Sequence, residues 1–242
     1  MTTRKKTIAL FGAGSGLGAS LAKRFAREGY QIAMVARRAE KLQEHVAELV
    51  NEGLEAAAFP ADLNDLSGIP ALVQSIEDRF GGIDVAVYAP VAPNIAFVPA
   101  ANLDAQTLRP FMDLYTYAPI QVANAVLQGQ LSRGDGAIVV VGGLTAVQPI
   151  AGMCGFGPAM AAARNYVHTL NAELGTAGIY AGTVIIGALI QRSASFASLT
   201  AAGDPIVTGF PVIDPDDIAE EIWTMVTKRD RVESLLPAMS TL

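Results

Sequence analysis

The chain is poor in the residues that build disulfide frameworks and metal centres. Its 242 residues include one cysteine, Cys154, and two histidines, His45 and His168. One cysteine excludes an intrachain disulfide framework. One cysteine and two histidines are also too few for a zinc centre built from these residues, so we expect no metal site. Cys154 has no His or Lys beside it in the sequence to lower its pKa, which argues against a nucleophilic role.

Charge is scarce as well. Only 17% of residues are charged, and 23 acidic residues outnumber 17 basic ones, giving a net charge of −6. An acidic balance argues against nucleic acid as a partner. The scarcity is greatest between residues 136 and 191, where Arg164 and Glu173 are the only charged side chains, and residues 136–163 carry none.

Two apolar stretches imitate membrane or targeting segments. The run 136–163 exceeds the roughly 20 residues that a membrane span needs, but six glycines and two prolines interrupt it. Residues 4–6 are basic and precede an apolar stretch at 7–22, as in a secretory signal. Four alternating glycines between positions 12 and 18 interrupt that stretch as a helix. We therefore expect a cytoplasmic protein without a membrane segment.

Just over half of the residues are hydrophobic, and they form short apolar runs that alternate with helical patterns. Such alternation predicts an α/β fold, a doubly wound parallel sheet of about seven strands with helices on both faces. We expect a single domain over residues 1–242, with an excursion at about 191–214 that covers a substrate. The predicted strands are 7–11, 31–36, 55–59, 83–88, 137–141 and 181–186, and the predicted helices are 17–29, 39–52, 67–80, 103–132, 156–175 and 216–227.

Glycines crowd the turn between the first strand and the first helix. The sequence Gly12-Ala-Gly-Ser-Gly-Leu-Gly18 has the spacing G-x-x-x-G-x-G. Small residues there let the backbone approach a pyrophosphate, whose charge the helix N-terminus attracts. A tight turn packed on the sheet is the plainer alternative. Four glycines at the first strand–helix junction favour a dinucleotide site.

The second and third strands end in residues suited to the adenosine half of a dinucleotide. Arg37 and Arg38 stand where an acidic residue would hold the ribose 2′-hydroxyl of NAD, and a guanidinium can instead clamp a 2′-phosphate. NADP(H) is therefore favoured over NAD(H), although both arginines could simply begin a solvated helix. Asp62 is a candidate acceptor for the adenine amino group, or a helix cap with Leu63 packed beneath it.

These motifs together resemble the short-chain dehydrogenase/reductase family. The resemblance rests on the glycine spacing, on Ala61-Asp62-Leu63 after the third strand, and on Gly81-Gly-Ile-Asp-Val85 before the fourth, and it covers nearly the whole chain. It implies a Rossmann-like fold. Ala89-Pro90 and Ile186-Gly187 replace the family's usual Asn-Ala and Pro-Gly at the cofactor. The expected cofactor-binding residues are Gly12, Gly14, Ser15, Gly16, Leu17, Gly18, Arg37, Arg38, Asp62, Leu63, Ala89, Pro90, Ile186 and Gly187.

The resemblance also implies an Asn-Ser-Tyr-Lys tetrad, and this chain lacks it. Residues 162–174 fix the register of the helix that should carry Tyr and Lys. By that register Tyr115 stands at the asparagine position, Gly143 at serine, Phe156 at tyrosine and Met160 at lysine. The site should be apolar, with Ala188 and Cys154 as further candidate lining residues. Tyr115 is a candidate proton donor, though it could simply fill volume.

A further tyrosine and two basic residues have weaker claims. Tyr88 ends the fourth strand, where burial against the cofactor is a better fit than chemistry. Arg164 and His168 follow Met160 on a helical stripe that should face the surface or another subunit.

Two functions fit this sequence. The first is an NADP(H)-dependent oxidoreductase that transfers hydride to an activated apolar acceptor, such as a quinone, enone or imine-like compound, without the Tyr/Lys pair. The second is a catalytically silent NADP(H)-binding subunit or sensor that acts through oligomer partners. The resemblance implies a homodimer or homotetramer formed through the helices 103–132 and 156–175.

Overall fold

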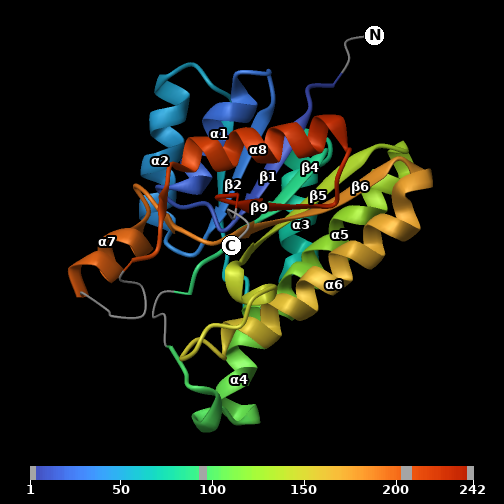
Figure 1. The fold of residues 1–242 in the computed structure, drawn as a ribbon. Helices are drawn as coiled ribbons and strands as arrows, with labels where there is room; N and C mark the ends of the chain where they lie inside the picture. Colours follow the sequence, from blue (N-terminus) through green and yellow to red (C-terminus); the bar gives the residue numbers. More distant parts are fainter. Residues whose placement is uncertain (1–3, 93–96, 203–208, 239–242) are drawn as a thin grey trace.

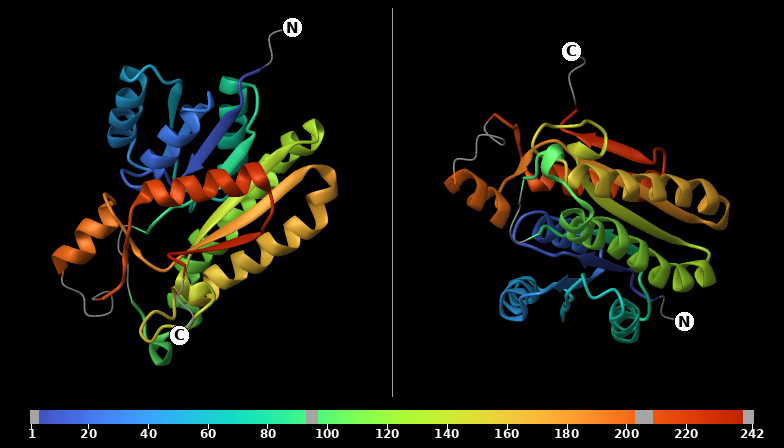
Figure 2. Two further views of the ribbon diagram at one scale, coloured as in Figure 1. Left: turned by 45° about the horizontal axis from the view of Figure 1, so that its top comes forward. Right: turned by 90° about the horizontal axis from the view of Figure 1, so that it is seen from below.

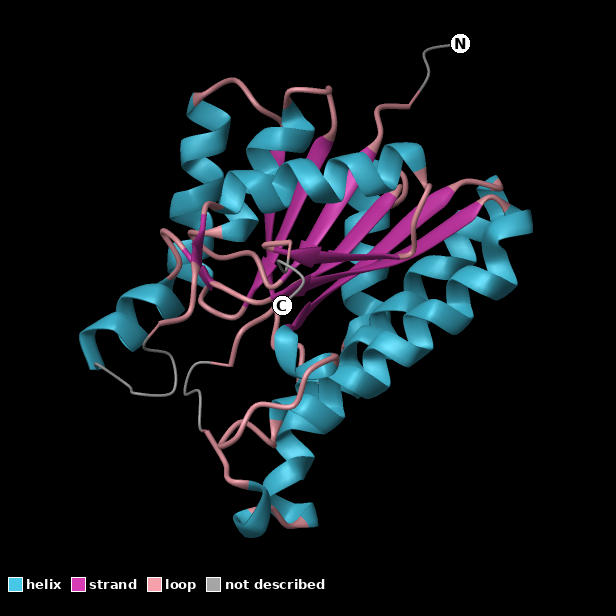
Figure 3. Cartoon of the chain, viewed as in Figure 1, coloured by secondary structure: helices cyan, strands magenta, loops and turns pink. Residues whose placement is uncertain are grey.

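Parallel strands form one central sheet in the computed structural model, which describes residues 4–92, 97–202 and 209–238. The strand order is β3-β2-β1-β4-β5-β6-β9, and every neighbouring pair is parallel. Figure 3 shows these strands fanned out between the helices. Their bounds are β1 Thr7–Phe11, β2 Gln31–Ala36, β3 Ala56–Pro60, β4 Val85–Tyr88, β5 Gly136–Gly143, β6 Ile179–Ile186 and β9 Glu233–Leu236.

Helices cover both faces of the sheet, which confirms the predicted doubly wound α/β fold. One face packs on α1 (Leu17–Ala26), α2 (Ala39–Asn51) and α8 (Pro215–Lys228), and the other on α3 (Ile69–Phe80), α5 (Ala118–Arg133) and α6 (Phe156–Leu174). Figures 1 and 2 show α8 beside α1, and α5 beside α6.

The period of two along each strand explains how the sheet serves two cores. In β1, Ile8 and Leu10 point to the α1/α8 side, while Ala9 and Phe11 point to the α3/α5 side, and all four are buried. A strand buried on both faces reads as a continuous apolar run. The sequence shows such runs at most of these strands.

The strand order reverses between β1 and β4. The chain builds the sheet outward through β2 and β3, then returns to β4 and builds in the other direction. The connections after β1 and β4 therefore diverge and leave a crevice at the carboxyl ends of the two strands.

Strand β9, at the edge of the sheet, was not located by the sequence analysis. It has four half-buried residues, too few for a visible alternation. Arg164 Nη2 donates to Glu233 Oε1 at 2.9 Å, and His168 Nε2 lies 3.1 Å from Glu233 Oε2. Burial disfavours the charged carboxylate, but hydrogen bonds from Arg164 and His168 hold the pKa of Glu233 below its ordinary value. Arg164 and His168, which the sequence analysis assigned to the surface or to a contact with another subunit, thus anchor β9.

The single helix predicted over residues 103–132 is interrupted. Its parts are α4 (Ala105–Met112), a π-helical turn (Asp113–Tyr117) and α5. Pro119 has no N–H to donate to the Tyr115 carbonyl, and the backbone N–H of Ala118 instead donates to the Asp113 carbonyl. Proline in this stretch was the available sequence signal for an irregular turn.

The excursion over residues 191–214, for which the sequence allows a loop or a short helix, has regular secondary structure in its described parts. It contains α7 (Ala194–Ala202), and a short ladder pairs β7 (Leu189–Ile190) with β8 (Val212–Ile213). Figure 2 shows α7 projecting to one side of the sheet. Residues 203–208 of the predicted excursion lie outside the described residues. The remaining short helices are η1 Ala100–Asn102, η3 Leu144–Ala146 and η4 Gly175–Ala177.

Candidate active site

A cavity of about 630 Å³ opens at the carboxyl ends of β1, β4, β5 and β6. It runs from the glycine-rich turn and the end of β2 to the start of α6. All fourteen residues expected to bind the cofactor line it, and so do the four residues at the tetrad positions. Ala188 lines it too, whereas Cys154 is not among the lining residues. In the described parts of the chain, no cluster of three metal-ligating side chains occurs and no helix is long and apolar enough to cross a membrane.

Two glycines of the turn are required by close packing. Gly12 has φ +97°, and a Cβ there would lie 2.4 Å from the Cα of Pro90, at the end of β4. A Cβ on Gly18 would lie 2.8 Å from the Cα of Ala13. The N–H groups of Gly12 and Ala13 both donate to the carbonyl of Val35, at 2.9 and 2.8 Å. The turn is thereby fixed between β2 and β4.

Gly14 differs from these two, whereas Gly16 is also closely packed, against Ser193. A Cβ on Gly14 would meet nothing within 4 Å, and Gly14 lines the cavity. Gly16 is the N-cap of α1, and no side chain caps that helix. The first N–H groups of α1, on Leu17 and Gly18, therefore remain available to an anion in the cavity.

One end of the cavity is basic. Arg37 and Arg38 are exposed there, and no ion pair holds either guanidinium within the described residues. Lys41, Glu44 and His45, which the sequence analysis did not single out, line the same end from α2, so basic side chains outnumber the one carboxylate that this helix contributes. A 2′-phosphate is the kind of anion that such a cluster fits.

Asp62 does not cap α3, so that alternative reading is wrong. Its carboxylate accepts from the N–H and the Nδ2 of Asn64, at 3.0 and 2.9 Å, while Gly68 is the N-cap of α3. Leu63 is buried in the core beneath it. Asp62 is exposed at the cavity, and a carboxylate oxygen can accept from an amino group there.

The four tetrad positions come together at the other end of the cavity. The N–H of Gly143 donates to the sulfur of Met160 at 3.1 Å. A Cβ on Gly143 would lie 3.3 Å from that sulfur, so the thioether occupies the space beside the missing side chain. Phe156 is buried, with its ring centroid 4.9 Å from that of Phe111 and 5.5 Å from that of Tyr115. No ionisable group lies at positions 143, 156 and 160.

Tyr115 and Tyr88 are both buried but have different partners. The Tyr115 hydroxyl accepts from the N–H of Ala92 at 3.0 Å, and Tyr115 lines the cavity. Burial raises the pKa of Tyr115, and the hydrogen bond from Ala92 offsets part of that rise. Tyr88 donates to the Leu114 carbonyl at 2.6 Å, and burial raises its pKa well above the ordinary value. Tyr88 is not among the residues that line the large cavity, contrary to the expected burial against the cofactor.

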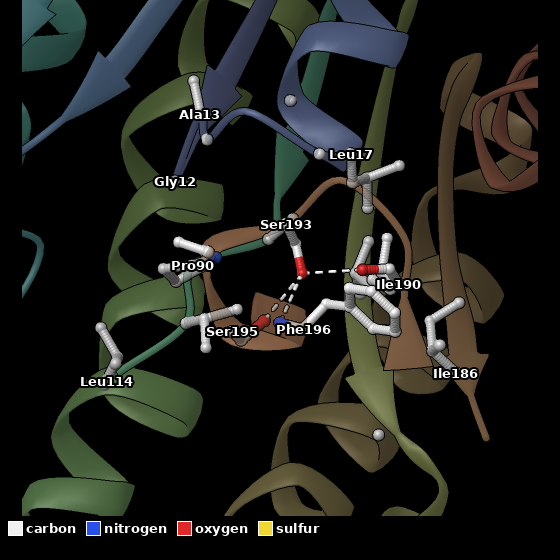
Figure 4. Close-up of a pocket in the computed structure, with 18 of the residues that line it drawn as sticks. Gly12, Ala13, Leu17, Pro90, Leu114, Ile186, Ile190, Ser193, Ser195 and Phe196 are labelled. Carbon is white, nitrogen blue, oxygen red and sulfur yellow. Dashed lines mark hydrogen bonds between the residues drawn. The ribbon is translucent and has the colours of Figure 1, made fainter. Parts of the chain in front are cut away.

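The excursion reaches the glycine-rich turn, which the sequence did not indicate. A Cβ on Gly16 would lie 2.9 Å from the Cβ of Ser193, and Ser15 Oγ donates to the Arg192 carbonyl at 3.0 Å. Arg192 pairs with Asp214 at 2.7 Å. Figure 4 shows Ser193 between Leu17 and Pro90. Its hydroxyl donates a hydrogen bond to the Ile190 carbonyl, accepts one from the N–H of Phe196 and is hydrogen-bonded to the Ser195 hydroxyl. This contact was not predictable, because it joins segments about 180 residues apart.

Comparison with known proteins identifies the family. The model of the short chain dehydrogenase family matches residues 6–196, most of the chain. The chain belongs to the short-chain dehydrogenase family. It is 28% identical over 239 residues to a fatty acyl-CoA reductase of Mycobacterium tuberculosis, covering 97% of this chain and 77% of that protein. It is 27% identical over 238 residues to a 2,3-dihydro-2,3-dihydroxybenzoate dehydrogenase of Bacillus subtilis, covering 92% and 89%.

Solved structures of two reductases share the fold. An actinorhodin polyketide ketoreductase with NADPH superposes with a TM-score of 0.85 at 23% identity, covering 97% of both chains. An L-sorbose reductase from Gluconobacter frateurii, complexed with NADPH and L-sorbose, has a TM-score of 0.85 at 22% identity, covering 99% of this chain and 98% of that one. This member of the family therefore has the Rossmann-like architecture expected from its sequence.

Two glycine substitutions test which glycines of the turn the fold requires. Gly12→Ala combines a positive φ with overlap at Pro90, so it should lower the free energy of unfolding by about 2 kcal/mol or more. Gly14→Ala meets open space and should change it by less than about 0.5 kcal/mol. Urea denaturation of both variants measures the difference. Equal destabilisation would contradict the role assigned to the contact between Gly12 and Pro90.

Proposed function

We propose that this chain is an NADP(H)-dependent oxidoreductase that transfers hydride to an activated apolar acceptor without a Tyr/Lys acid–base pair. The observation that carries the proposal is the single cavity, which joins a glycine-rich turn and a basic end to an apolar end without ionisable groups at positions 143, 156 and 160. The first part suits a phosphorylated dinucleotide, and the second suits a flat hydrophobic acceptor.

The residues present fit the dinucleotide. Gly14 leaves open space beside the uncapped N-terminus of α1, where a pyrophosphate would be held. Arg37 and Arg38 would hold the 2′-phosphate, and Asp62 the adenine amino group. Ala89, Pro90, Ile186 and Gly187 would contact the remaining parts from the ends of β4 and β6. A metagenomic short-chain oxidoreductase of the same fold was solved in complex with NADP, which supports the preference.

The apolar end decides which acceptors are suitable. When bound, NADPH supplies a hydride. Phe156 has no proton to give and Met160 no charge to lower a pKa, so the help of about 10²- to 10⁴-fold from general acid–base catalysis is missing. A quinone or enone tolerates this loss, because delocalisation stabilises the anion formed by hydride addition until water supplies the proton. Tyr115, like any tyrosine, is protonated at neutral pH, and burial raises its pKa further, so it can donate a hydrogen bond but is a weak acid.

The nature of the lining also favours an apolar acceptor. The rings of Phe97, Phe156, Phe196 and Phe210 line the cavity together with Met153 and Leu199. Such a lining favours burial of hydrophobic surface. The relative from Mycobacterium tuberculosis is named for a fatty acyl group, which is also apolar.

The absence of the usual residues from the four tetrad positions is equally consistent with a silent NADP(H)-binding subunit or sensor. In that case the ligand would stabilise a dimer or tetramer formed through α5 and α6. Both functions require cofactor binding, and turnover distinguishes them.

Arg37→Ala tests the cofactor assignment. Removing a guanidinium that binds a 2′-phosphate should weaken NADPH binding by about 10- to 100-fold, while NADH binding stays within about twofold. Titration of nucleotide fluorescence measures both affinities. Arg109→Ala, an exposed arginine outside the cavity, is the matched control. An equal loss for the two nucleotides would show that Arg37 does not read the 2′-phosphate.

An acceptor panel tests the reaction itself. We expect NADPH consumption above the buffer rate with 2,3-dimethyl-1,4-naphthoquinone and none with cyclohexanone, a simple ketone that needs a proton donor. Both quinone ring positions are blocked by methyl groups, so Cys154 cannot add to them. Binding of NADPH without consumption by any quinone, enone or imine would refute the oxidoreductase and leave the silent subunit.

A further inference from the structure

A threonine lies beside the space left at Gly143. The hydroxyl Oγ1 of Thr145 is 4.0 Å from the position that a Cβ on Gly143 would take. The family resemblance puts at Gly143 a serine whose hydroxyl binds the substrate carbonyl. A serine hydroxyl there would lie within reach of the Thr145 hydroxyl, so Thr145 presents the same chemical group to the same part of the cavity.

Thr145 is held on rigid elements. It is the central residue of η3, which follows directly on β5, and only 9% of its surface is exposed. Its backbone packs against the first turn of α6, because a Cβ on Gly157 would lie 3.3 Å from the Thr145 carbonyl oxygen. A side chain held in this way can bind a ligand atom without first being ordered.

The Thr145 hydroxyl differs from the other cavity hydroxyls in having no partner within the described residues. Each of the other hydroxyls has at least one partner: Ser15 donates to Arg192, Ser193 donates to Ile190, Ser195 is hydrogen-bonded to Ser193, and Tyr115 accepts from Ala92 while keeping its own proton. Met160 accepts from Gly143 and has no donor to offer. The hydroxyl is not among the buried side-chain atoms that lack a partner, so it is open to the cavity and free to donate to a ligand there.

We propose that Thr145 Oγ1 donates a hydrogen bond to the carbonyl oxygen of the acceptor and so takes over the binding role of the missing serine. The inference rests on the proposed function for the class of its ligand, an apolar carbonyl compound such as a quinone. Thr145 binds and orients the acceptor oxygen. It transfers no proton, because its aliphatic hydroxyl is far too weak an acid.

A pair of ligands isolates this hydrogen bond. The quinone 2,3-dimethyl-1,4-naphthoquinone has carbonyl oxygens, and 2,3-dimethylnaphthalene has nearly the same shape without them. Thr145→Val replaces the hydroxyl by a methyl group at nearly constant volume. It should weaken quinone binding by about 3- to 10-fold, the usual range for one neutral hydrogen bond, and leave hydrocarbon binding unchanged. Thr145→Ser should retain quinone binding.

Binding is measured by ligand-observed NMR, with and without saturating NADP⁺, and needs no turnover. Thermal unfolding shows whether each variant is folded, and Thr145→Ala replaces Thr145→Val if the valine variant is not. In steady-state assays the loss should raise KM for the quinone more than it lowers kcat. Unchanged quinone affinity in the valine variant, or equal weakening of quinone and hydrocarbon, would overturn the proposal. Failure of the protein to bind NADPH would instead count against the proposed function, because the quinone measurement without nucleotide remains valid.

Discussion

The close approach of Gly12 to Pro90 is the constraint on which the cleft depends. The two residues end adjacent parallel strands, and the space where Gly12 would carry a side chain is filled by the backbone of Pro90. This contact draws the glycine-rich turn against the end of β4, at the point where the strand order reverses. The turn then directs the N-terminus of α1 into the cavity. The basic end of the cavity follows from the same arrangement, because β2 lies beside β1 and is followed directly by Arg37 and Arg38.

The other end of the cleft is organised by a contact between two substituted positions. The sulfur of Met160 accepts the N–H of Gly143 and fills the space beside it. A serine at 143 would therefore press on Met160, and a lysine at 160 would lose this packing. Positions 143 and 160 depend on each other sterically. Placing the usual tetrad residue at one of them alone would disturb the packing of the residue now at the other. Aromatic rings around Phe156 complete an apolar surface.

Much of the fold could be predicted because it rests on local patterns. Buried strands read as apolar runs, the glycine-rich turn has a fixed spacing, and α6 begins at Phe156 as predicted. Local patterns did not locate the π-helical turn at Asp113–Tyr117, which interrupts a predicted helix, or the strand β9. The first depends on how Pro119 alters hydrogen bonding in a helix, and the second is a four-residue edge held by a tertiary ion pair with Arg164.

The residues of the site also fall into some that the sequence predicts and others that it does not. The residues expected to bind the cofactor all line the cavity, because they follow the carboxyl ends of strands at the same edge of the sheet. Contacts between distant segments gave no local signal, as with Ser193 against Gly16 and Tyr88 with the Leu114 carbonyl. Thr145 carries no recognisable sequence signal for a related reason. Its position two residues after Gly143 gains meaning only when the fold places its hydroxyl beside the position where a side chain at 143 would begin.

The pH dependence of hydride transfer tests most directly the claim that the cleft binds NADPH but lacks acid–base groups. In single turnovers with saturating NADPH and quinone, the account predicts a rate constant that stays within about twofold from about pH 6 to about pH 9, because no residue assigned to the reacting end titrates there. The ordinary pKa of a tyrosine already lies above that window, and burial raises the pKa of Tyr115 further. A rate that rises or falls through an ionisation within it would contradict the account, as would a complete absence of hydride transfer.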